Sequence, residues 1–254
     1  MKSLRSHVVR MFKLQLERRG RMVVPRGWGL DPLADVRRLA QIWHYPLELL
    51  FDIGANEGQT AKRFLQEFPG AEVLSFEPHP ATFARLTERM SEAPHFRAFN
   101  LGLSTEIGEM EMFEYELSTI NSLTPDAQYA KRYQQQGRSV SVKVSTVDAF
   151  CAQQRIGFID LLKIDTEGFD LIVLKGGAGM LEKRAVRFVL VEFNDLQPIE
   201  GVFGGALLPF DEFLRPLGFQ FVATYNDYIN TQEKMFAVSN ALFCLPPGIP
   251  TESA

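Results

Sequence analysis

From residue 47 onward, short apolar runs alternate with segments of helical periodicity, and this rhythm limits the possible folds more than any other feature. Nearly continuous apolar strands separated by helices are typical of a parallel sheet that is covered on both faces. Right-handed crossovers between such strands predict an open, doubly wound α/β sheet. The predicted strands are Leu47–Ile53, Glu72–Phe76, Phe96–Leu101, Phe158–Ile164 and Phe188–Phe193, and the predicted helices between the first three are Thr60–Phe68 and Pro80–Met90.

Other segments depart from this rhythm. Alternating side chains predict added strands at Glu109–Tyr115 and Ser139–Val144, and a closing strand pair at Phe219–Ala223 and Ala241–Leu245. The polar segment 118–138 is longer than most connections in a compact sheet domain, so we expect it to close over an acceptor as a lid.

The start of the chain carries a separate signal. Residues 1–26 contain eight Lys or Arg against one acid, Glu17, so this segment has a net charge of +7 in a chain of net charge −4. Apolar residues at helical spacing run from Leu4 to Leu16, and Leu33–Trp43 predicts a further helix. We therefore divide the chain into a helical basic N-terminal arm, 1–46, and a globular domain, 47–254. The arm either packs on the domain or contacts anionic lipid as an interfacial helix.

Composition excludes several other classes. The acidic remainder of the chain argues against a nucleic-acid partner, because phosphate contacts need clustered cations. Two distant cysteines, Cys151 and Cys244, form no metal pattern, and the start lacks a secretory signal. We expect a cytoplasmic protein, with peripheral membrane contact through residues 1–26 as an option. No pattern in the sequence indicates an oligomeric state.

A glycine loop joins the first predicted strand to the first helix of the domain. Asp52, Gly54, Ala55, Asn56 and Gly58 occupy it. Glycines at this position let the backbone approach a ligand, and ligands of open α/β sheets bind beyond the carboxyl ends of the strands. The G-x-x-x-G spacing does not meet the dinucleotide fingerprint G-x-G-x-x-G. The carboxylate of Asp52 suits a cationic ligand group such as an ammonium better than a diphosphate.

An acid also ends the second predicted strand. Glu77, followed by Pro78, lies about 20 residues past the glycine loop, where such sheets hold a ribose diol. Asn100 and Leu101 lie at the end of the third strand, where they would either meet an adenine or form a simple turn. Together with the loop, these residues predict a site for a nucleoside with a charged amino-acid tail.

Further polar residues end the fourth and fifth strands. Asp165 and Glu167 follow one, and Glu192 and Asn194 follow the other. Oxygen ligands suit Mg²⁺, which Asp165, Glu192 and Asn194 would hold. Without a metal, Asp165 or Glu192 would act as general base. The alternative is structural: Lys163 neutralises one acid and the others cap turns or helices.

These motifs resemble those of the FkbM-type methyltransferases. The likeness covers roughly residues 47–245, and its most specific part is K-I-D-x-E-G. The resemblance implies a class I methyltransferase-like sheet, mostly parallel with an antiparallel last strand, S-adenosylmethionine as cofactor, and O-methylation of a sugar, glycan or secondary metabolite. It assigns the methionine part of the cofactor to the glycine loop, the ribose to Glu77, and the family's signature acids to Asp165 and Glu167. The matching segments are Asp52–Gly58, Phe76–Pro78, Ser145–Asp148, Lys163–Asp170, where Asp170 replaces a frequent Glu, and Val173–Gly176.

Three other functions stay open from the residues alone. A Rossmann oxidoreductase is disfavoured by the missing fingerprint, while N-methylation needs no metal and is compatible with the same motifs. A non-catalytic cofactor-binding scaffold would not need Asp165, Glu167 and Glu192, all of which are present. The acceptor is expected to be a small molecule or glycan, recognised by segments 118–138 and 195–209.

Overall fold

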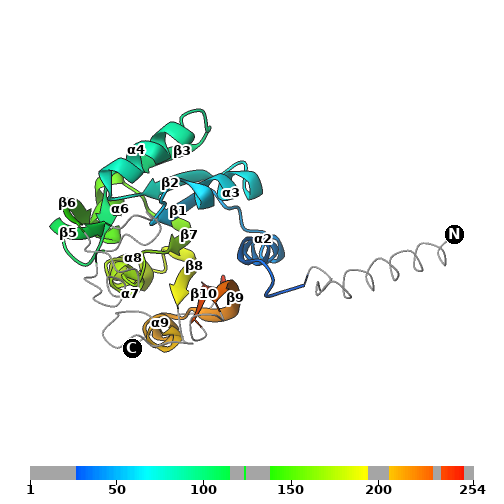
Figure 1. The fold of residues 1–254 in the computed structure, drawn as a ribbon. Coiled ribbons are helices and arrows are strands. Elements are labelled where there is room, and N and C mark those ends of the chain that lie inside the picture. Colours follow the sequence, from blue (N-terminus) through cyan, green and yellow to red (C-terminus); the bar gives the residue numbers. More distant parts are fainter. Residues whose placement is uncertain (1–26, 115–122, 124–137, 194–205, 231–235, 249–254) are drawn as a thin grey trace.

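The computed structural model describes residues 27–114, 123, 138–193, 206–230 and 236–248 (Figure 1). A seven-stranded sheet runs through the molecule in the order β3-β2-β1-β7-β8-β10-β9. Its strands are β1 (Leu49–Ile53), β2 (Glu72–Phe76), β3 (Phe96–Phe99), β7 (Ile159–Ile164), β8 (Val186–Phe193), β9 (Gln220–Asn230) and β10 (Phe236–Cys244). The doubly wound α/β fold is therefore confirmed.

The last strand runs against the others. β10 lies between β8 and β9 and is antiparallel to both, whereas β1, β2, β3, β7 and β8 pair in parallel. This confirms the antiparallel last strand that the resemblance implied. The predicted third strand was too long, because its end turns away after Phe99 and continues as β4 (Gly102–Leu103) in a second sheet.

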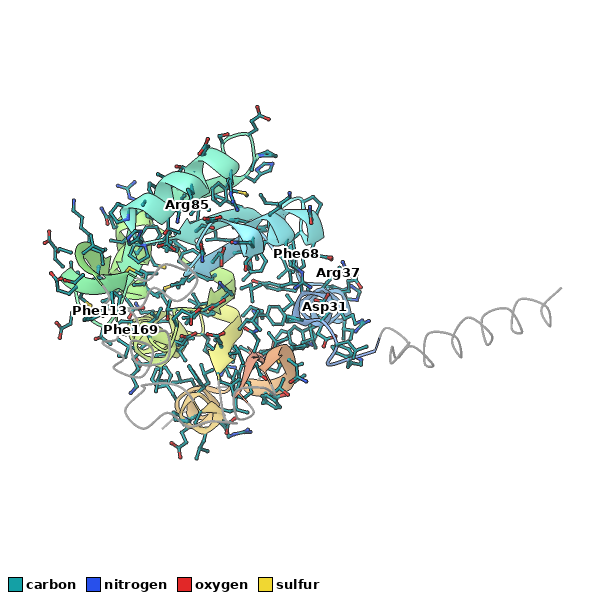
Figure 2. All side chains as sticks on the ribbon, in the orientation of Figure 1. Asp31, Arg37, Phe68, Arg85, Phe113 and Phe169 are labelled. Atoms are coloured by element: carbon teal, nitrogen blue, oxygen red, sulfur yellow. The ribbon has the colours of Figure 1, made fainter. Side chains whose placement is uncertain are left out.

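Helices cover both faces of the main sheet, and side chains fill the space between them (Figure 2). Strand residues alternate between the two apolar clusters: Leu50 packs on one face, and Phe51 and Ile53 on the other. Helices α2 (Pro32–Ile42), α3 (Gln59–Glu67) and α4 (Pro80–Arg89) cover the face of Leu50. Helices α6 (Val147–Gln154), α7 (Asp170–Lys175), α8 (Ala178–Glu182) and α9 (Leu207–Leu214), with the 3-10 turn η2 (Arg215–Leu217), belong to the face of Phe51.

A small second sheet stands beside the carboxyl edge of the main one. It has the order β4-β6-β5, with β5 at Gly108–Glu114 and β6 at Arg138–Ser145. Met112, Val142 and Val144 from this sheet join the cluster on the face of Phe51. Both added strands were predicted, while the predicted lid 118–138 falls outside the described residues except for Leu123 and Arg138.

Helix α2 contacts strand β9, which lies near the C-terminal end of the sequence. Its N-terminus is capped by Asp31, whose side chain accepts hydrogen bonds from the N–H groups of Leu33 and Ala34. Asp35 is fully buried and accepts a hydrogen bond from the hydroxyl of Tyr225 on β9, at 2.8 Å. Helix α2, which the prediction placed in the arm, packs on the sheet through Leu33, Val36 and Ala40.

The rest of the arm, residues 1–26, lies outside the described residues, and the boundary at residue 46 stays a prediction. No helix within the described ranges has the length and apolar composition needed to cross a membrane.

Candidate active site

The glycine loop turns sharply at the carboxyl end of β1. The N–H groups of Gly54 and Ala55 both donate to the carbonyl of Phe76 on β2, which fixes the loop to the sheet. Gly54 has φ +76, and a Cβ there would lie 1.8 Å from the carbonyl oxygen of Asp165. Only glycine fits this position, because it tolerates both the left-handed conformation and the close approach. Gly58, at φ +90, forms the N-cap of α3 without a side-chain hydrogen bond.

Asp52 has a partner within the chain. Its fully buried carboxylate lies 2.9 Å from the Nζ of Lys163, which is itself 3.4 Å from Asp165 Oδ2 and 3.4 Å from the carbonyl of Gly54. Burial lowers the pKa of Lys163, but the carboxylates of Asp52 and Asp165 outweigh burial and hold it above its ordinary value. Lys163 therefore links β1, the glycine loop and Asp165 at the end of β7. The predicted contact of Asp52 with a ligand ammonium stays a prediction, and the structural alternative for Lys163 describes this geometry.

Glu77 occupies the next strand end in a different way. Its two carboxylate oxygens accept hydrogen bonds from the N–H groups of Asn56, at 3.0 Å, and His79, at 2.9 Å. Burial raises the pKa of Glu77 to about 7, although both N–H groups act in the opposite direction. Each oxygen retains a further lone pair, so the carboxylate can also accept from hydroxyl groups of a ligand.

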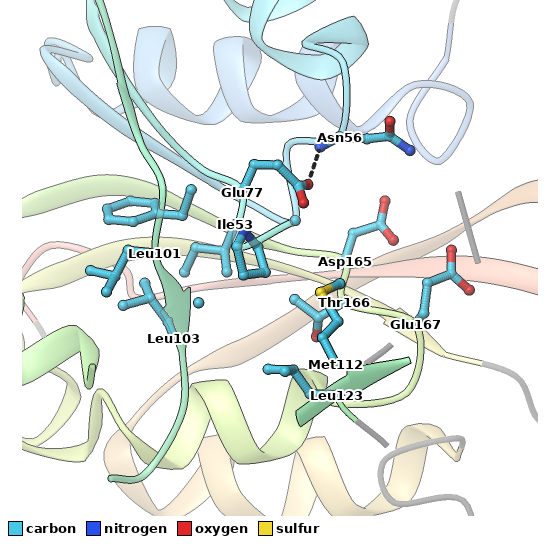
Figure 3. A pocket seen from close by; sticks show the side chains of 14 residues that line it. Ile53, Asn56, Glu77, Leu101, Leu103, Met112, Leu123, Asp165, Thr166 and Glu167 are labelled. Atoms are coloured by element: carbon cyan, nitrogen blue, oxygen red, sulfur yellow. Dashed lines mark hydrogen bonds between the residues drawn. The ribbon is translucent and has the colours of Figure 1, made fainter. Parts of the chain in front are cut away.

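A cavity of about 120 Å³ opens beside this carboxylate; we call it the first cavity (Figure 3). Whole-ligand pockets begin at roughly 300 Å³, so the described walls enclose only part of a ligand. The lining contains Ile53, Gly54, Asn56, Phe76, Glu77, Pro78, Leu101, Gly102, Leu103, Met112, Leu123, Asp165, Thr166 and Glu167. It combines one apolar end with carboxylates at the other.

The remaining predicted cofactor residues lie around the first cavity and do not line it. Asp52, Ala55 and Gly58 shape the loop behind it. Asn100 donates both amide hydrogens within the chain, to the carbonyls of Glu77 and Pro78 at 2.9 and 2.8 Å. Its side chain thus holds the strand end that carries Glu77. The adenine contact predicted for Asn100 has no counterpart in this lining, whereas Leu101 is part of it.

Carboxylates gather at the ends of β7 and β8. Oxygen atoms of Asp165, Glu167 and Glu192 lie within 4.8 Å of one another. Glu167 projects from a left-handed backbone, φ +54, a conformation that costs a non-glycine residue roughly 1–2 kcal/mol. Burial and the neighbouring acids Asp165, Glu167 and Asp170 raise the pKa of Glu192 well above its ordinary value. Asn194, the third predicted metal ligand, lies outside the described residues.

Asp170, to which no function was assigned from the sequence, belongs to the same group of acids. Asp170 is buried at the start of α7 and accepts hydrogen bonds from the N–H and hydroxyl of Thr166, at 3.2 and 3.0 Å. Burial, followed by the charge of Asp165, raises its pKa to about 6. Asp170 therefore shapes the turn that presents Asp165 and Glu167. Its place two residues past the K-I-D-x-E-G segment was the available signal.

Comparison with known proteins agrees with this geometry. The model of the methyltransferase FkbM domain matches residues 52–221. The chain is 30% identical to the 2-O-methyltransferase NoeI of Sinorhizobium fredii over 176 residues, which cover 65% of this chain and 71% of that protein. It is 32% identical to the hexuronic acid methyltransferase AglP of Haloferax volcanii over 148 residues, 58% of this chain and 56% of that protein.

A third relative is the 31-O-demethyl-FK506 methyltransferase FkbM of Streptomyces tacrolimicus. It is 29% identical over 204 residues, which cover 70% of this chain and 75% of that protein. The family model begins at the acid that ends β1 and continues into β9, so it spans both the glycine loop and the carboxylate group. On this evidence the chain belongs to the FkbM methyltransferase domain family.

Proposed function

We propose that this protein is an S-adenosylmethionine-dependent methyltransferase that O-methylates a hydroxyl of a sugar, glycan or secondary metabolite. The observation that carries the proposal is the first cavity, whose lining contains the strand-end carboxylate Glu77 together with Asp165 and Glu167. If the ribose of a nucleoside binds to Glu77, the part of the ligand beyond the ribose lies next to Asp165 and Glu167. The names of the relatives NoeI, AglP and FkbM support a hydroxyl-bearing small molecule or glycan as acceptor.

The residues present fit the nucleoside part of this cofactor. Apolar side chains of Leu101, Leu103 and Met112 offer a surface for a flat base, and Glu77 offers lone pairs to a ribose diol. The positive φ angles of Gly54 and Asn56 bring the backbone close to the cavity. When bound, S-adenosylmethionine supplies a methyl group on a positively charged sulfur. The cluster of acids at the other end suits that charge.

Asp165 is the residue we assign as general base. It is the acid that both lines the first cavity and contacts Lys163, so its carboxylate is held at the place where an acceptor hydroxyl must arrive. The carboxylate would take the proton of the acceptor hydroxyl, and the oxygen would then be able to receive the methyl group that the bound cofactor would supply. Raised pKa values at Glu192 and Asp170 let these neighbours share the proton that Asp165 receives.

A divalent ion is the second part of the proposal. Asp165, Glu167 and Glu192 supply the oxygen donors that Mg²⁺ prefers, and Glu167 replaces Asn194 as the third described donor. A bound ion would supply Lewis-acid activation of the acceptor oxygen.

Two measurements test the proposal. Calorimetric titration should show binding of S-adenosylhomocysteine and none of NAD; tighter binding of NAD would contradict the assignment. Turnover of a methylated acceptor, followed with methyl-labelled cofactor, should vanish in a chelator and return with Mg²⁺ or Mn²⁺. Full turnover in the chelator would remove the metal and leave general-base catalysis by Asp165.

A further part of the proposal concerns where the protein acts, and it rests on the basic segment 1–26. We propose that it contacts anionic lipid at the cytoplasmic surface of a membrane, because its net charge of +7 is attracted to such surfaces. The protein should sediment with vesicles that contain anionic lipid but not with neutral vesicles, and added salt should release it. A variant with Arg18, Arg19 and Arg21 changed to Gln should bind more weakly. Equal binding by this variant would exclude the electrostatic contact.

A further inference from the structure

A second cavity lies on the other face of the sheet from the first. It measures about 280 Å³ and is bounded by α3, by the start of α2 and by strands β7 to β10. Its apolar walls, Leu33, Phe64 and Leu190, belong to the cluster on the face of Leu50. The apolar walls of the first cavity, such as Ile53 and Phe76, belong to the opposite cluster.

The two cavities meet at one ion pair. Lys163 lines the second cavity and Asp165 lines the first, and their charged atoms lie 3.4 Å apart. A second link runs through Asn240, which also lines the second cavity and lies directly opposite Glu192 in the pairing of β10 with β8. Since paired residues project from the same face of a sheet, a ligand beside Asn240 is close to the carboxylate group.

The lining of the second cavity combines apolar side chains with four polar uncharged residues and three charged residues, and the charged side chains are paired within the chain. Thr60 offers a hydroxyl, and Asn226 and Asn240 offer amides that can donate and accept. The charged Arg63 is already paired with Asp31 at 2.6 Å, and Lys163 is paired with two carboxylates. Such a lining favours a neutral ligand with many hydroxyl groups over an anion. The volume of about 280 Å³ lies near the lower limit of ligand pockets, roughly 300 Å³, which suits a single sugar-sized ring.

The two cavities take their lining residues from different parts of the sequence, and this difference indicates different functions. Every residue of the first cavity lies within 52–221, the part that the family model matches. The second cavity takes Leu30, Leu33, Tyr225, Asn226 and Asn240 from outside that range. A cofactor is shared by a family, whereas an acceptor distinguishes its members, so this division fits a cofactor in the first cavity and an acceptor in the second.

We infer that the second cavity binds the acceptor as a polyhydroxylated ring, with Thr60, Asn226 and Asn240 as the residues that select it. The inference rests on the proposed function and deepens it. The ring enters from the side of Arg63 and Asp31, whose half-exposed side chains face solvent. The hydroxyl to be methylated points past Lys163 toward Asp165.

The test uses the full chain saturated with S-adenosylhomocysteine and a panel of methyl glycosides, four of neutral hexoses and one of a hexuronic acid, at millimolar concentration. Ligand-observed saturation-transfer NMR should detect at least one neutral glycoside. Its dissociation constant should rise about three- to tenfold in Asn240→Ala and in Thr60→Val, the loss of one neutral hydrogen bond. The control Thr87→Val, whose hydroxyl bonds to its own helix at Phe83 and Ala84, should bind as wild type does.

The other outcomes are distinguishable. Absence of any glycoside signal from wild type, or equal binding by all variants, overturns the inference and leaves the proposed function intact. A weaker S-adenosylhomocysteine affinity in Asn240→Ala or Thr60→Val would place the amino-acid end of the cofactor in the second cavity, which also overturns the inference. Failure of wild type to bind S-adenosylhomocysteine would instead overturn the proposed function. Unchanged thermal midpoints confirm that the variants are folded.

Discussion

The site has two halves, which differ in the chemical groups that form them. One half lies at the carboxyl ends of β1 and β2, and the other lies at those of β7 and β8. At β1 and β2 the site consists of backbone N–H groups, glycine conformations and one carboxylate that lines the first cavity, Glu77, held by two of those N–H groups. At β7 and β8 it consists of side-chain charges around Lys163, whose Nζ lies 2.9 Å from the carboxylate of Asp52 on β1 and 3.4 Å from that of Asp165.

The first half is defined by the geometry of the backbone, and the second half is defined by side-chain charges. Backbone groups fixed by the sheet hold one geometry and change little when a single side chain is altered. A cluster of buried charges depends on every member, because each one compensates for the burial of another. Substitutions at the ends of β1 and β2 should therefore change the affinity for the cofactor. Substitutions at the ends of β7 and β8 should change the rate of methyl transfer and the stability of the fold.

The largest effect is expected at the proposed base. Asp165→Asn keeps the size of the side chain but cannot take a proton, so kcat should fall about 10²- to 10⁴-fold. The affinity for S-adenosylhomocysteine should stay within about twofold, since Glu77 and the loop are untouched. The exposed acid Glu111 on β5 gives the control, Glu111→Gln, which should leave both quantities unchanged. An equal loss of affinity and rate in Asp165→Asn would break the division between the halves.

Stability should respond next, through Lys163. Lys163→Met leaves the carboxylate of Asp52 fully buried without its counter-ion, and breaking such a pair costs about 3–5 kcal/mol of unfolding free energy. The double variant Asp52→Asn with Lys163→Met should recover part of that loss, because no buried charge is then uncompensated. Denaturant unfolding measures both, with the exposed Lys62→Met as control. A single variant as stable as wild type would show that water reaches Asp52.

A smaller effect is expected from Glu77. Glu77→Gln removes a charged acceptor, and hydrogen bonds to charged groups contribute about 1.5–3 kcal/mol, so the dissociation constant of S-adenosylhomocysteine should rise roughly ten- to hundredfold. The value of kcat at saturating cofactor should change far less. Glu72→Gln, at the exposed start of the same strand, is the matched control. If Glu77→Gln lowered kcat and spared affinity, the assignment of the two halves would be reversed.

The smallest effect is a dependence on pH. The pKa of Glu77 is raised from 4.5 to about 7 by burial, so only about one carboxyl in ten is ionised at pH 6. If the ionised form accepts from the ribose, cofactor affinity should increase up to about tenfold from pH 6 to pH 8, and Glu77→Gln should lose this dependence. A flat profile for wild type would mean that the neutral acid binds equally well.

The same pKa shift has a consequence for the free protein, with the opposite sign. Because the folded-state pKa lies above the ordinary value, the contribution of Glu77 to stability is complete below about pH 4.5 and is lost as the pH rises through about 7. Glutamine is neutral at every pH, so the thermal midpoint of ligand-free wild type should fall relative to that of Glu77→Gln as the pH rises from about 4.5 to above 7.

Local sequence patterns predicted the half that is built from backbone. Gly54 and Gly58 between a strand and a helix, and Glu77 at the next strand end, lie where their spacing implied. The partners of Lys163 were not predictable in the same way, since its contact with the Gly54 carbonyl joins residues 109 positions apart. Which acid a lysine neutralises depends on side-chain packing across strands, and no spacing rule encodes it.

Strand ends near solvent were also beyond the sequence patterns. The closing pair was predicted as two strands of five residues, whereas β9 has eleven and β10 has nine. Exposed polar side chains such as Thr224 and Asn226 interrupt the apolar pattern there, yet their backbones stay paired with Ala241 and Ser239. The second cavity depends on this extension, so its residues could not be identified as a site from the sequence.

The position of β10 between β8 and β9 has a consequence for the order of folding during synthesis. A ribosome completes β1, β2, β3, β7 and β8 before β10 exists, so the edge of β8 that carries Glu192 must wait unpaired until nearly the whole chain has been made. Helix α2, made first, waits equally long for its hydrogen bond to Tyr225, 190 residues away. The half of the sheet that carries the glycine loop can therefore assemble early, while the compartment between α2 and the final hairpin closes last.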